Sequence, residues 1–575
     1  MKKRNNTHQL AWAKDPSECL HAGSYQRVDD TILRDSIMLE HTQQIDRLLS
    51  QQDKQSSLFL KILQQRFLTR EEWTMLGGRP SSGMSEYALM YGQLLKSRQL
   101  LSFTSNDHEQ IYNTLLQHYL PKTNTFFFSP KPVPIPLSTV DRHLIITGRT
   151  GSGKTEFLKA LFYQLQFTSQ QKQQCSLILL DPHGDMAEQL FSLRLNLLKP
   201  ERIWYIDPQL KDGRIPCLNP FWQQVNNPML LDLMAQQWAK TFSELIPEIG
   251  MSLQMEALLK PCLAVLFHKG QCGLSDLQDF MDDQTNAHWV ALGKQSSNPV
   301  YSSFFENAFL NKKYAPTKLA VYTRLQLLLN NHTFYQMMNG QSSIDLKKGM
   351  DEGKLILFNL SKGKLGEDTS KALGRFVSAT LLSIALQRAF EPEHKRKPCY
   401  LFVDEFHNFV SSSMETVFSE TRKYRLHLLV GTQTIGQLPL SLKEMVLNNT
   451  AVKLVGLNGL PALKSQAGDL GVSFTDLQLL PPFQFYLKID HYPALKIKSP
   501  NHLIENKKKF FADAKEKLLL KNYLLDKSDL YRVIMQKERQ QSEWKHNKNT
   551  VANTSPDGGV PNSSGTNEFK PKFGL

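Results

Sequence analysis

The hydrophobic and polar positions of the chain change their period along its length. From about residue 138 to 224, and again from 346 to 500, short apolar runs alternate with segments whose apolar residues recur every three or four positions. Short apolar runs are typical of strands buried on both faces, and the longer period is typical of helices. The pattern predicts an α/β fold with a mainly parallel sheet. The predicted strands are Leu144–Thr147, Cys175–Leu180, Ile203–Ile206, Leu355–Leu360, Tyr400–Val403, Leu426–Val430, Val452–Leu457 and Phe483–Ile489.

Between about residues 225 and 345 the strand pattern disappears, and apolar residues recur only at helical spacing. Ser275, followed three residues later by Gln278, has the form of a capping box that opens a helix. This stretch predicts an all-α domain inserted into the α/β domain. The two helical series are Leu231, Met234, Trp238, Phe242 and Leu245, and Leu319, Tyr322, Leu325 and Leu329.

The N-terminal part of the chain has a different character. Residues 1 to about 130 are polar with helical spacing, and we expect a capping box at Thr69 and Glu72 and a helix over Glu86–Leu101. A small helical docking bundle is favoured over a winged-helix or helix-turn-helix unit. The proline-rich segment Ser129–Leu137 predicts a linker, because proline cannot continue a helix.

The C-terminal part is basic. A helical pattern continues to about Arg539, and from Asn547 onward Asn, Ser, Gly and Pro dominate, which predicts a disordered tail. Solvated charges are the favoured interpretation of its lysines, and contacts with DNA or a partner are the alternative. The predicted organisation is a helical N-terminal region (1–130), two parts of the α/β domain (131–228 and 346–505), the inserted all-α domain (229–345), and the basic segment with the tail (506–575).

Composition narrows the classes of function. The net charge of +14 and the pI near 9.2 favour an anionic partner, most simply nucleic acid. The six cysteines never form a C-x-x-C pair, so we expect reduced core thiols rather than a zinc site or a disulfide framework. No apolar stretch approaches the roughly 20 residues that span a bilayer, and the N-terminus has no signal-peptide pattern. We therefore expect a cytoplasmic protein without a transmembrane anchor of its own, with docking at the inner face of the membrane left open.

The stretch GRTGSGKT, residues 148–155, matches the phosphate-binding pattern G-x-x-x-x-G-K-[ST]. It follows a predicted strand and opens a predicted helix, and this order places main-chain N–H groups and a helix N-terminus around a polyphosphate. Lys154 would contact the β and γ phosphates of ATP, and the Thr155 hydroxyl would bind Mg²⁺. A flexible glycine linker is the alternative. The expected binding residues are Gly148, Arg149, Thr150, Gly151, Ser152, Gly153, Lys154 and Thr155.

Two adjacent carboxylates, Asp404 and Glu405, end another predicted strand. In a P-loop enzyme the first carboxylate helps to hold Mg²⁺ and the second can polarise the attacking water. The carboxyl ends of parallel strands are where such sheets bind ligands. A solvated acidic loop is the alternative. Asp181 and Asp185 also follow a strand, and proximity to the nucleotide and a loop-capping role are equally compatible with their position.

Three more polar residues lie around the strand LHLLVGT. Gln433 follows this strand, where its amide can bond to the γ-phosphate or to the attacking water. A helix is predicted from about Ser413 to Arg425, before this strand. Its residues Arg422 and Arg425 can each supply charge to the transition state, in their own site or in a neighbouring subunit. A solvated surface position is the more frequent role of an arginine.

Six motifs occur in an order that resembles the type IV secretion coupling ATPases of the TraD/TraG conjugation type. The sequence is also similar to the HerA and FtsK DNA translocases, a wider group of RecA-like motors. The resemblance covers the α/β parts, and the all-α insert resembles the all-α domain of coupling proteins. The motifs are GRTGSGKT, LILLDPHGD, LILFNLSKGKLGED, YLFVDEFHNF, ETRKYRLHLLVGTQTIGQL and NNTAVKLVGL.

The resemblance implies a homo-hexameric ring that hydrolyses ATP with Mg²⁺ and moves DNA through a central channel. By motif, Lys154 and Thr155 are P-loop ligands, Asp404 and Glu405 are the metal-binding and catalytic carboxylates, and Gln433 is the sensor. Arg422 occupies the position of an arginine finger that acts in trans, ahead of Arg425. The implied partners are DNA, a relaxase and components of the type IV secretion channel.

The sequence therefore predicts a DNA-translocating ATPase of the coupling-protein type, acting in conjugative transfer. One alternative is a cytosolic HerA-like motor for DNA processing or packaging. A second is a secretion ATPase that moves protein without binding DNA, and a third is a nucleotide-gated scaffold. The family's membrane-anchored members begin with transmembrane helices, and this chain shows none, which counts against direct membrane anchoring. Anchorless coupling proteins and cytosolic translocases remain compatible with it.

Overall fold

The computed structural model describes residues 19–25, 131–171, 175–209, 215–245, 252–500, 510 and 531–532. The helices and the capping box expected before residue 130 lie outside the described residues, as do the basic segment and the tail, apart from 510 and 531–532. Within the N-terminal region the described part is strand β1 (Cys19–Tyr25). A two-residue strand, β13 (Tyr531–Arg532), pairs with β6 (Ile215–Pro216).

The centre of the molecule is an eleven-stranded sheet in the order β2-β1-β12-β11-β10-β3-β9-β8-β4-β7-β5. From β10 to β5 every neighbouring pair is parallel, and the remaining pairs are antiparallel. Every predicted strand is present, so the α/β fold with a mainly parallel sheet is confirmed. The bounds are β2 Lys131–Pro136, β3 Leu144–Thr147, β4 Ser176–Asp181, β5 Ile203–Ile206, β7 Leu355–Asn359, β8 Cys399–Val403, β9 Leu426–Thr432, β10 Val452–Gly456, β11 Gln484–Ile489 and β12 Leu495–Lys498.

Both faces of the parallel strands are buried, because alternate residues of one strand enter different cores. In β4, Leu177 and Leu179 belong to the core beneath α9 and α10, whereas Ile178 and Leu180 belong to the core beneath α20. All four side chains are fully buried. This explains why the strand reads as an unbroken apolar run. The covering helices include α9 (Lys154–Gln171), α10 (Asp185–Phe191), α20 (Glu367–Gln387), α21 (Ser412–Glu420) and α22 (Leu440–Asn449).

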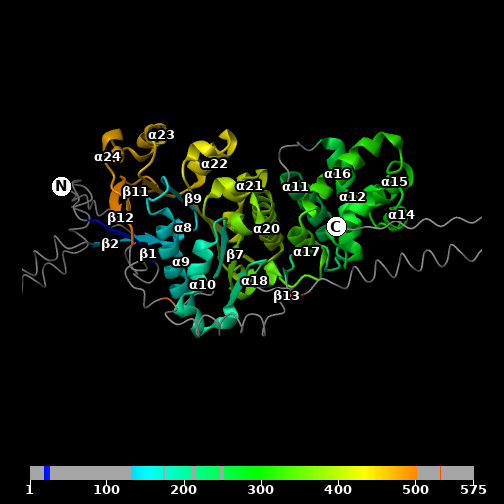
Figure 1. Ribbon diagram of the computed structural model, residues 1–575, viewed down its shortest axis with the longest axis horizontal. Helices are drawn as coiled ribbons and strands as arrows, with labels where there is room; N and C mark the ends of the chain where they lie inside the picture. Colours follow the sequence, from blue (N-terminus) through cyan, green and yellow to red (C-terminus); the bar gives the residue numbers. More distant parts are fainter. Residues whose placement is uncertain are drawn as a thin grey trace, which may run out of the picture.

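Beyond the sheet the chain is helical from α11 to α18, and the described residues between Pro228 and Glu352 contain no strand. In Figure 1 this green part lies to one side of the sheet. The predicted all-α insert is thus confirmed as part of the fold, and its boundaries remain a prediction. The helices are α11 Pro228–Leu245, α12 Leu253–Lys269, α13 Leu274–Met281, α14 Ala287–Lys294, α15 Pro299–Asn307, α16 Ala315–Leu329, α17 His332–Asn339 and α18 Leu346–Glu352.

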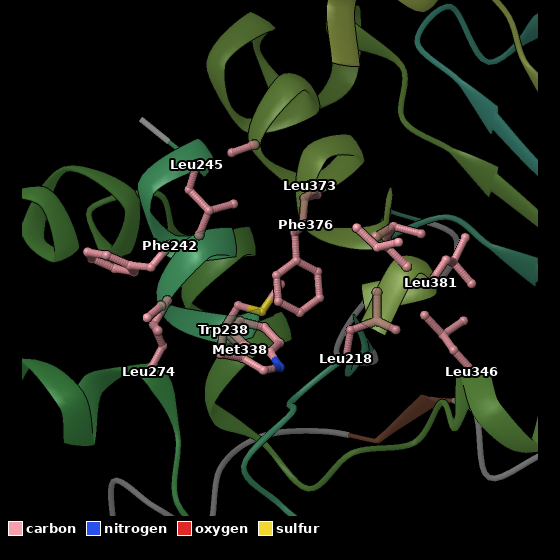
Figure 2. Packing of buried hydrophobic residues seen from close by; sticks show 14 of the residues in the cluster. Leu218, Trp238, Phe242, Leu245, Leu274, Met338, Leu346, Leu373, Phe376 and Leu381 are labelled. Atoms are coloured by element: carbon pink, nitrogen blue, oxygen red, sulfur yellow. The ribbon is translucent and has the colours of Figure 1, made fainter. Parts of the chain in front are cut away.

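The helical part is joined to the α/β part by a shared core. The ring of Trp238 on α11 lies 5.1 Å from that of Phe376 on α20, between centroids. Figure 2 shows these two rings with Met338, and Phe242 and Leu245 farther along α11. Helix α11 therefore holds the two parts together as well as beginning the helical region.

Three local predictions differ from the structure. The segment predicted as a linker contains strand β2, which pairs with β1. A proline-rich segment can form a strand here because an edge strand tolerates proline. Helix α13 begins at Leu274, one residue before the predicted cap at Ser275. Its cap is Gly273, whose N–H donates to Asp276 Oδ2 at 2.6 Å. The predicted helix over 413–425 ends at Glu420, and a 3-10 turn, η8 (Thr421–Tyr424), follows.

Several other predictions can be compared with the described residues. One member of the predicted helical series, Leu319, is 66% exposed, so α16 turns it outward. No helix in the described ranges is long and apolar enough to cross a membrane. Five cysteines of the described ranges are buried, as predicted for core thiols: Cys175, Cys217, Cys262, Cys272 and Cys399.

Candidate nucleotide-binding site

The glycine loop at residues 148–153 joins β3 to α9, as the sequence predicts. Neighbouring strands brace it through the main chain. Gly148 N donates to the main-chain oxygen of Gln433 at 3.2 Å, and Arg149 N donates to that of Leu457 at 2.8 Å. On the other side, Phe483 N donates to the main-chain oxygen of Ser152 at 2.9 Å. The loop is therefore held by the ends of β9 and β10 and by the residue that precedes β11.

Two glycines of this loop have left-handed backbone angles. Gly151 has φ 80° and Gly153 has φ 99°. A Cβ built on Gly153 would also lie 2.7 Å from Cδ1 of the Phe483 ring. Both the angle and the lack of space exclude a larger residue at Gly153 without strain.

Four polar side chains from two elements meet where α9 begins and β8 ends. Lys154 Nζ lies 3.1 Å from Glu405 Oε1. Thr155 Oγ1 donates to Asp404 Oδ2 at 2.8 Å. Strand β9 lies between the strands that carry these two motifs, so parallel register brings their carboxyl ends to one edge.

The backbone of Glu405 is itself unusual. It is in the left-handed region at φ 47°, where a non-glycine residue is strained. Its N–H donates to Asp404 Oδ1 at 3.0 Å, and Asn408 Nδ2 donates to its carbonyl oxygen at 3.0 Å. Lys362 Nζ in turn donates to Asn408 Oδ1 at 2.7 Å. Sequence reasoning missed Lys362 and Asn408; their only signal was polarity directly after β7 and β8.

Negative charge dominates the buried part of the site. Burial raises the pKa of Asp404; the Thr155 hydrogen bond and Lys154 oppose this rise, while Glu405 and Asp181 add to it. Glu405 Oε2 is buried and accepts no hydrogen bond from the described residues, with His407 Nδ1 at 3.4 Å. Burial also lowers the pKa of His407. A cation would offset this charge.

The site supplies few metal ligands of its own. No group of three or more His, Cys, Asp or Glu side chains suited to a metal occurs among the residues described. Thr155 and Asp404 would provide two oxygens. Such a set fits Mg²⁺, which usually takes one or two carboxylates and completes its shell with phosphate and water.

The other predicted polar residues near this edge have distinct positions. Asp181 accepts from the main-chain N–H groups of His183 at 3.0 Å and Ala187 at 2.9 Å, so the loop-capping alternative holds for it. Asp185 is exposed in the first turn of α10. Gln433 directly follows β9, and its main-chain oxygen contacts the glycine loop. Its role as a sensor remains a prediction.

Arg422 and Arg425 lie at the opposite edge of the sheet, because both precede β9 and the phosphate loop lies beyond its end. Seven residues of strand span about 20 Å. Arg425 Nη1 lies 3.6 Å from Asp141 Oδ2, whereas Arg422 is exposed in η8. The alternative that either arginine serves its own site is therefore wrong, because neither side chain can cover that distance.

A buried polar cluster occupies this opposite edge. Tyr400 Oη donates to Asp141 Oδ1 at 2.8 Å, and His427 Nδ1 lies 2.8 Å from the main-chain oxygen of Asp141. Leu428 N donates to His143 Nδ1 at 3.0 Å. The pKa of His143 is lowered to about 3, mainly by burial and secondly by the nearby His427. Burial lowers the pKa of His427 as well.

The chain is similar to one family model and to several solved structures. Residues 128–379 match the family model DUF87, described as the central domain of the helicase HerA. The plasmid coupling protein TrwB in complex with ADP and Mg²⁺ is 17% identical, with a TM-score of 0.50, covering 64% of this chain and 87% of TrwB. VirB4 of Thermoanaerobacter pseudethanolicus is 13% identical, with a TM-score of 0.41, covering 64% of this chain and 90% of VirB4. No curated protein matches the chain.

Proposed function

We propose that this chain is a P-loop ATPase of the HerA/FtsK-like group, which hydrolyses ATP with Mg²⁺ and uses the free energy to move DNA. One observation carries the proposal: the structure brings two motifs together that are distant in sequence. Lys154 contacts Glu405, 251 residues away, and Thr155 contacts Asp404, 249 residues away. A solvated acidic loop and a flexible glycine linker would give neither pair.

The phosphates of ATP would lie on the glycine loop and the first turn of α9. Main-chain N–H groups and the helix dipole attract the negative charge there. Lys154 would contact the β and γ phosphates, and Thr155 with Asp404 would hold Mg²⁺, which neutralises developing phosphate charge. The TrwB structure contains ADP and Mg²⁺ on a related fold, which supports both ligands here.

Hydrolysis needs a polarised water, and Glu405 is placed for this task. In the structure its Oε1 pairs with Lys154. When the γ-phosphate attracts Lys154, that pair opens and the carboxylate becomes available to orient water and accept its proton. Gln433, which leaves β9 beside the loop, would sense the γ-phosphate.

DNA is the proposed cargo. The net charge of +14, the match to the HerA helicase domain and the fold shared with a plasmid coupling protein support this choice. We propose a homo-hexameric ring that delivers relaxase-bound DNA to a type IV secretion channel, from the cytoplasm or the inner face of the membrane. In this ring Arg422 reaches the nucleotide of the neighbouring subunit, and the insert at about 229–345 contacts DNA or relaxase.

A second candidate is a HerA-like motor for DNA processing or packaging. The family match to the central domain of HerA favours it specifically. Capture of a relaxase by the purified ring supports the coupling role, whereas binding and translocation of DNA without any relaxase partner supports the second candidate.

The test is the ATPase rate with and without DNA, on protein whose oligomeric state is measured in parallel. DNA should stimulate hydrolysis, and the stimulation should weaken with salt as counterion release requires. Lys154→Ala should reduce hydrolysis to background with the fold intact. Lys348→Ala, at an exposed lysine that pairs with Glu352, is the matched control and should keep wild-type activity.

Hydrolysis that DNA never stimulates, in a protein that binds no DNA, would favour a protein-secretion ATPase. Wild-type rates in Lys154→Ala would overturn the P-loop assignment itself.

A further inference from the structure

Phe483 braces the phosphate loop through its main chain, and its side chain has no role in the site described above. Its ring fills the space beside Gly153, since a Cβ on that glycine would meet Cδ1 at 2.7 Å and Cε1 at 3.2 Å. Gly153 directly precedes Lys154, so this aromatic ring borders the place where the phosphates would enter α9.

The main chain fixes this residue on both sides. Phe483 N donates to the carbonyl oxygen of Ser152 at 2.9 Å, and Ser499 N donates to the carbonyl oxygen of Phe483 at 2.8 Å. Its φ of 64° is in the left-handed region, which is uncommon for a bulky side chain. Such strained residues persist where the surrounding structure holds them, and they cluster at ligand sites.

Core packing does not account for the strain. The Phe483 side chain is 39% exposed. Two residues later, Phe485 is fully buried and its ring packs edge-on against that of Phe157, 5.5 Å away between centroids. The core contact of this segment is thus made by Phe485, whereas the Phe483 ring is partly exposed beside the phosphate loop.

The order of strands tells which part of a nucleotide would reach this ring. The carboxylates that act on the γ-phosphate follow β8, on one side of β3. Phe483 precedes β11, which lies beyond β10 on the other side of β3. A triphosphate whose γ end points toward β8 directs its nucleoside toward β10 and β11.

We propose that Phe483 is the platform on which the base of the bound nucleoside triphosphate stacks. This inference rests on the proposed ATP binding and adds a base-binding residue to it. Stacking on an aromatic face is tolerant of the base. The ligand class is therefore a nucleoside triphosphate held mainly through its phosphates.

The experiment compares two ligands, ATP and inorganic tripolyphosphate, in the presence of Mg²⁺. Affinities are measured by calorimetry for the full chain and for Phe483→Leu, which keeps an apolar side chain but lacks the aromatic face. Loss of base stacking corresponds to roughly tenfold to hundredfold weaker ATP binding. Tripolyphosphate affinity should stay within about twofold, because it has no base. Phe483→Tyr should restore ATP affinity.

The matched control is Leu479→Ala, which removes another exposed apolar side chain from the same segment, 76% exposed. It should bind both ligands as the wild type does. Equal loss of ATP and tripolyphosphate in Phe483→Leu would show that the ring only braces the loop, and unchanged ATP affinity would show that the base binds elsewhere. Either result overturns the inference while ATP binding stands. A wild-type protein that binds neither ligand overturns the proposed ATP function and this inference together.

Discussion

The parallel sheet has a carboxyl edge, where its strands end, and an amino edge, where they begin. Both bury polar groups, but the P-loop pairs at the carboxyl edge and the two histidines at the amino edge bond to different kinds of atom. At the carboxyl edge the pairs join one side chain to another, as in Lys154–Glu405 and Thr155–Asp404. At the amino edge His143 and His427 bond to main-chain atoms of Leu428 and Asp141. A ligand can exchange the first kind of bond, whereas breaking the second kind disturbs the sheet. The difference separates groups that can react from groups that hold a geometry.

The largest expected effect tests whether Arg422, at the amino edge of one subunit, acts on the nucleotide at the carboxyl edge of the neighbouring subunit. Arg422→Ala should lower ATP hydrolysis by about 10³ to 10⁵, because an arginine supplied in trans stabilises transition-state charge. ATP binding should persist. Lys423→Ala, the adjacent exposed cation in the same 3-10 turn, is the control and should retain activity.

Mixing gives the sharper form of this test. Rings assembled from Arg422→Ala and Glu405→Gln subunits should regain part of the activity, because an intact Glu405 can then adjoin an intact Arg422. Mixed rings that stay inactive at every ratio would remove the support for a role in trans.

The next effect concerns the carboxyl edge alone. Glu405→Gln should reduce the hydrolysis rate by about 10² to 10⁴, the usual contribution of a general base. Nucleotide binding should be retained, since the loop and Lys154 are unchanged. Glu415→Gln, a glutamate of α21 that bonds to Ser441, is the control. A full rate in Glu405→Gln would assign the base elsewhere.

The histidines of the amino edge should affect the stability of the protein in acid rather than its rate of ATP hydrolysis. His143 keeps its pKa at about 3 in the folded protein, below its ordinary 6.5. Below pH 6.5 the unfolded chain gains a proton there that the folded chain does not. The free energy of unfolding should therefore fall as the pH drops from about 6.5 toward 3, by up to roughly 1.4 kcal/mol per pH unit. Urea denaturation across this range measures the slope.

His143→Asn isolates that contribution. Asparagine tolerates the left-handed backbone of this position, φ 69°, and its side-chain oxygen can accept the Leu428 N–H. The free energy of unfolding of this variant should fall less steeply with falling pH than that of the wild type. His491→Asn, at an exposed histidine, should keep the wild-type slope. An unchanged slope in His143→Asn would place the acid sensitivity elsewhere.

The smallest effect returns to the carboxyl edge. Gly153→Ala should destabilise the protein by about 1 to 3 kcal/mol, because alanine is strained at φ 99° and would clash with Phe483. Gly468→Ala, within helix α23 (Leu460–Leu470) and with open space around it, should instead be neutral or stabilise by roughly 0.5 to 1 kcal/mol. Equal unfolding midpoints for the two variants would show that alanine at position 153 is not strained.

Much of this arrangement could be predicted from local sequence. The strands were predictable because burial on both faces leaves unbroken apolar runs, and the two principal motifs because each directly follows such a run. The roles of their residues remain predictions, although the structure brings the side chains together. Resemblance to known families, rather than spacing, pointed to Arg422.

The parts that could not be predicted depend on contacts distant in sequence. The contact of Phe483 with the phosphate loop joins residues more than 300 positions apart, and no spacing rule covers it. The same holds for Lys362 and Asn408, 46 residues apart. The sequence predicts a linker at β2 because the partner strand, β1, lies more than 100 residues upstream.

The prolines of β2 have a consequence for how copies of this chain can meet. Pro132, Pro134 and Pro136 alternate along an outermost strand, so their missing N–H groups fall on one side of it. With β1 paired on the inner side, the outer rim offers carbonyl oxygens and few donors. A strand from another molecule that paired there would lack three N–H donors, so the prolines disfavour extension of the described sheet by strand addition. Side-chain contacts are favoured instead at this rim.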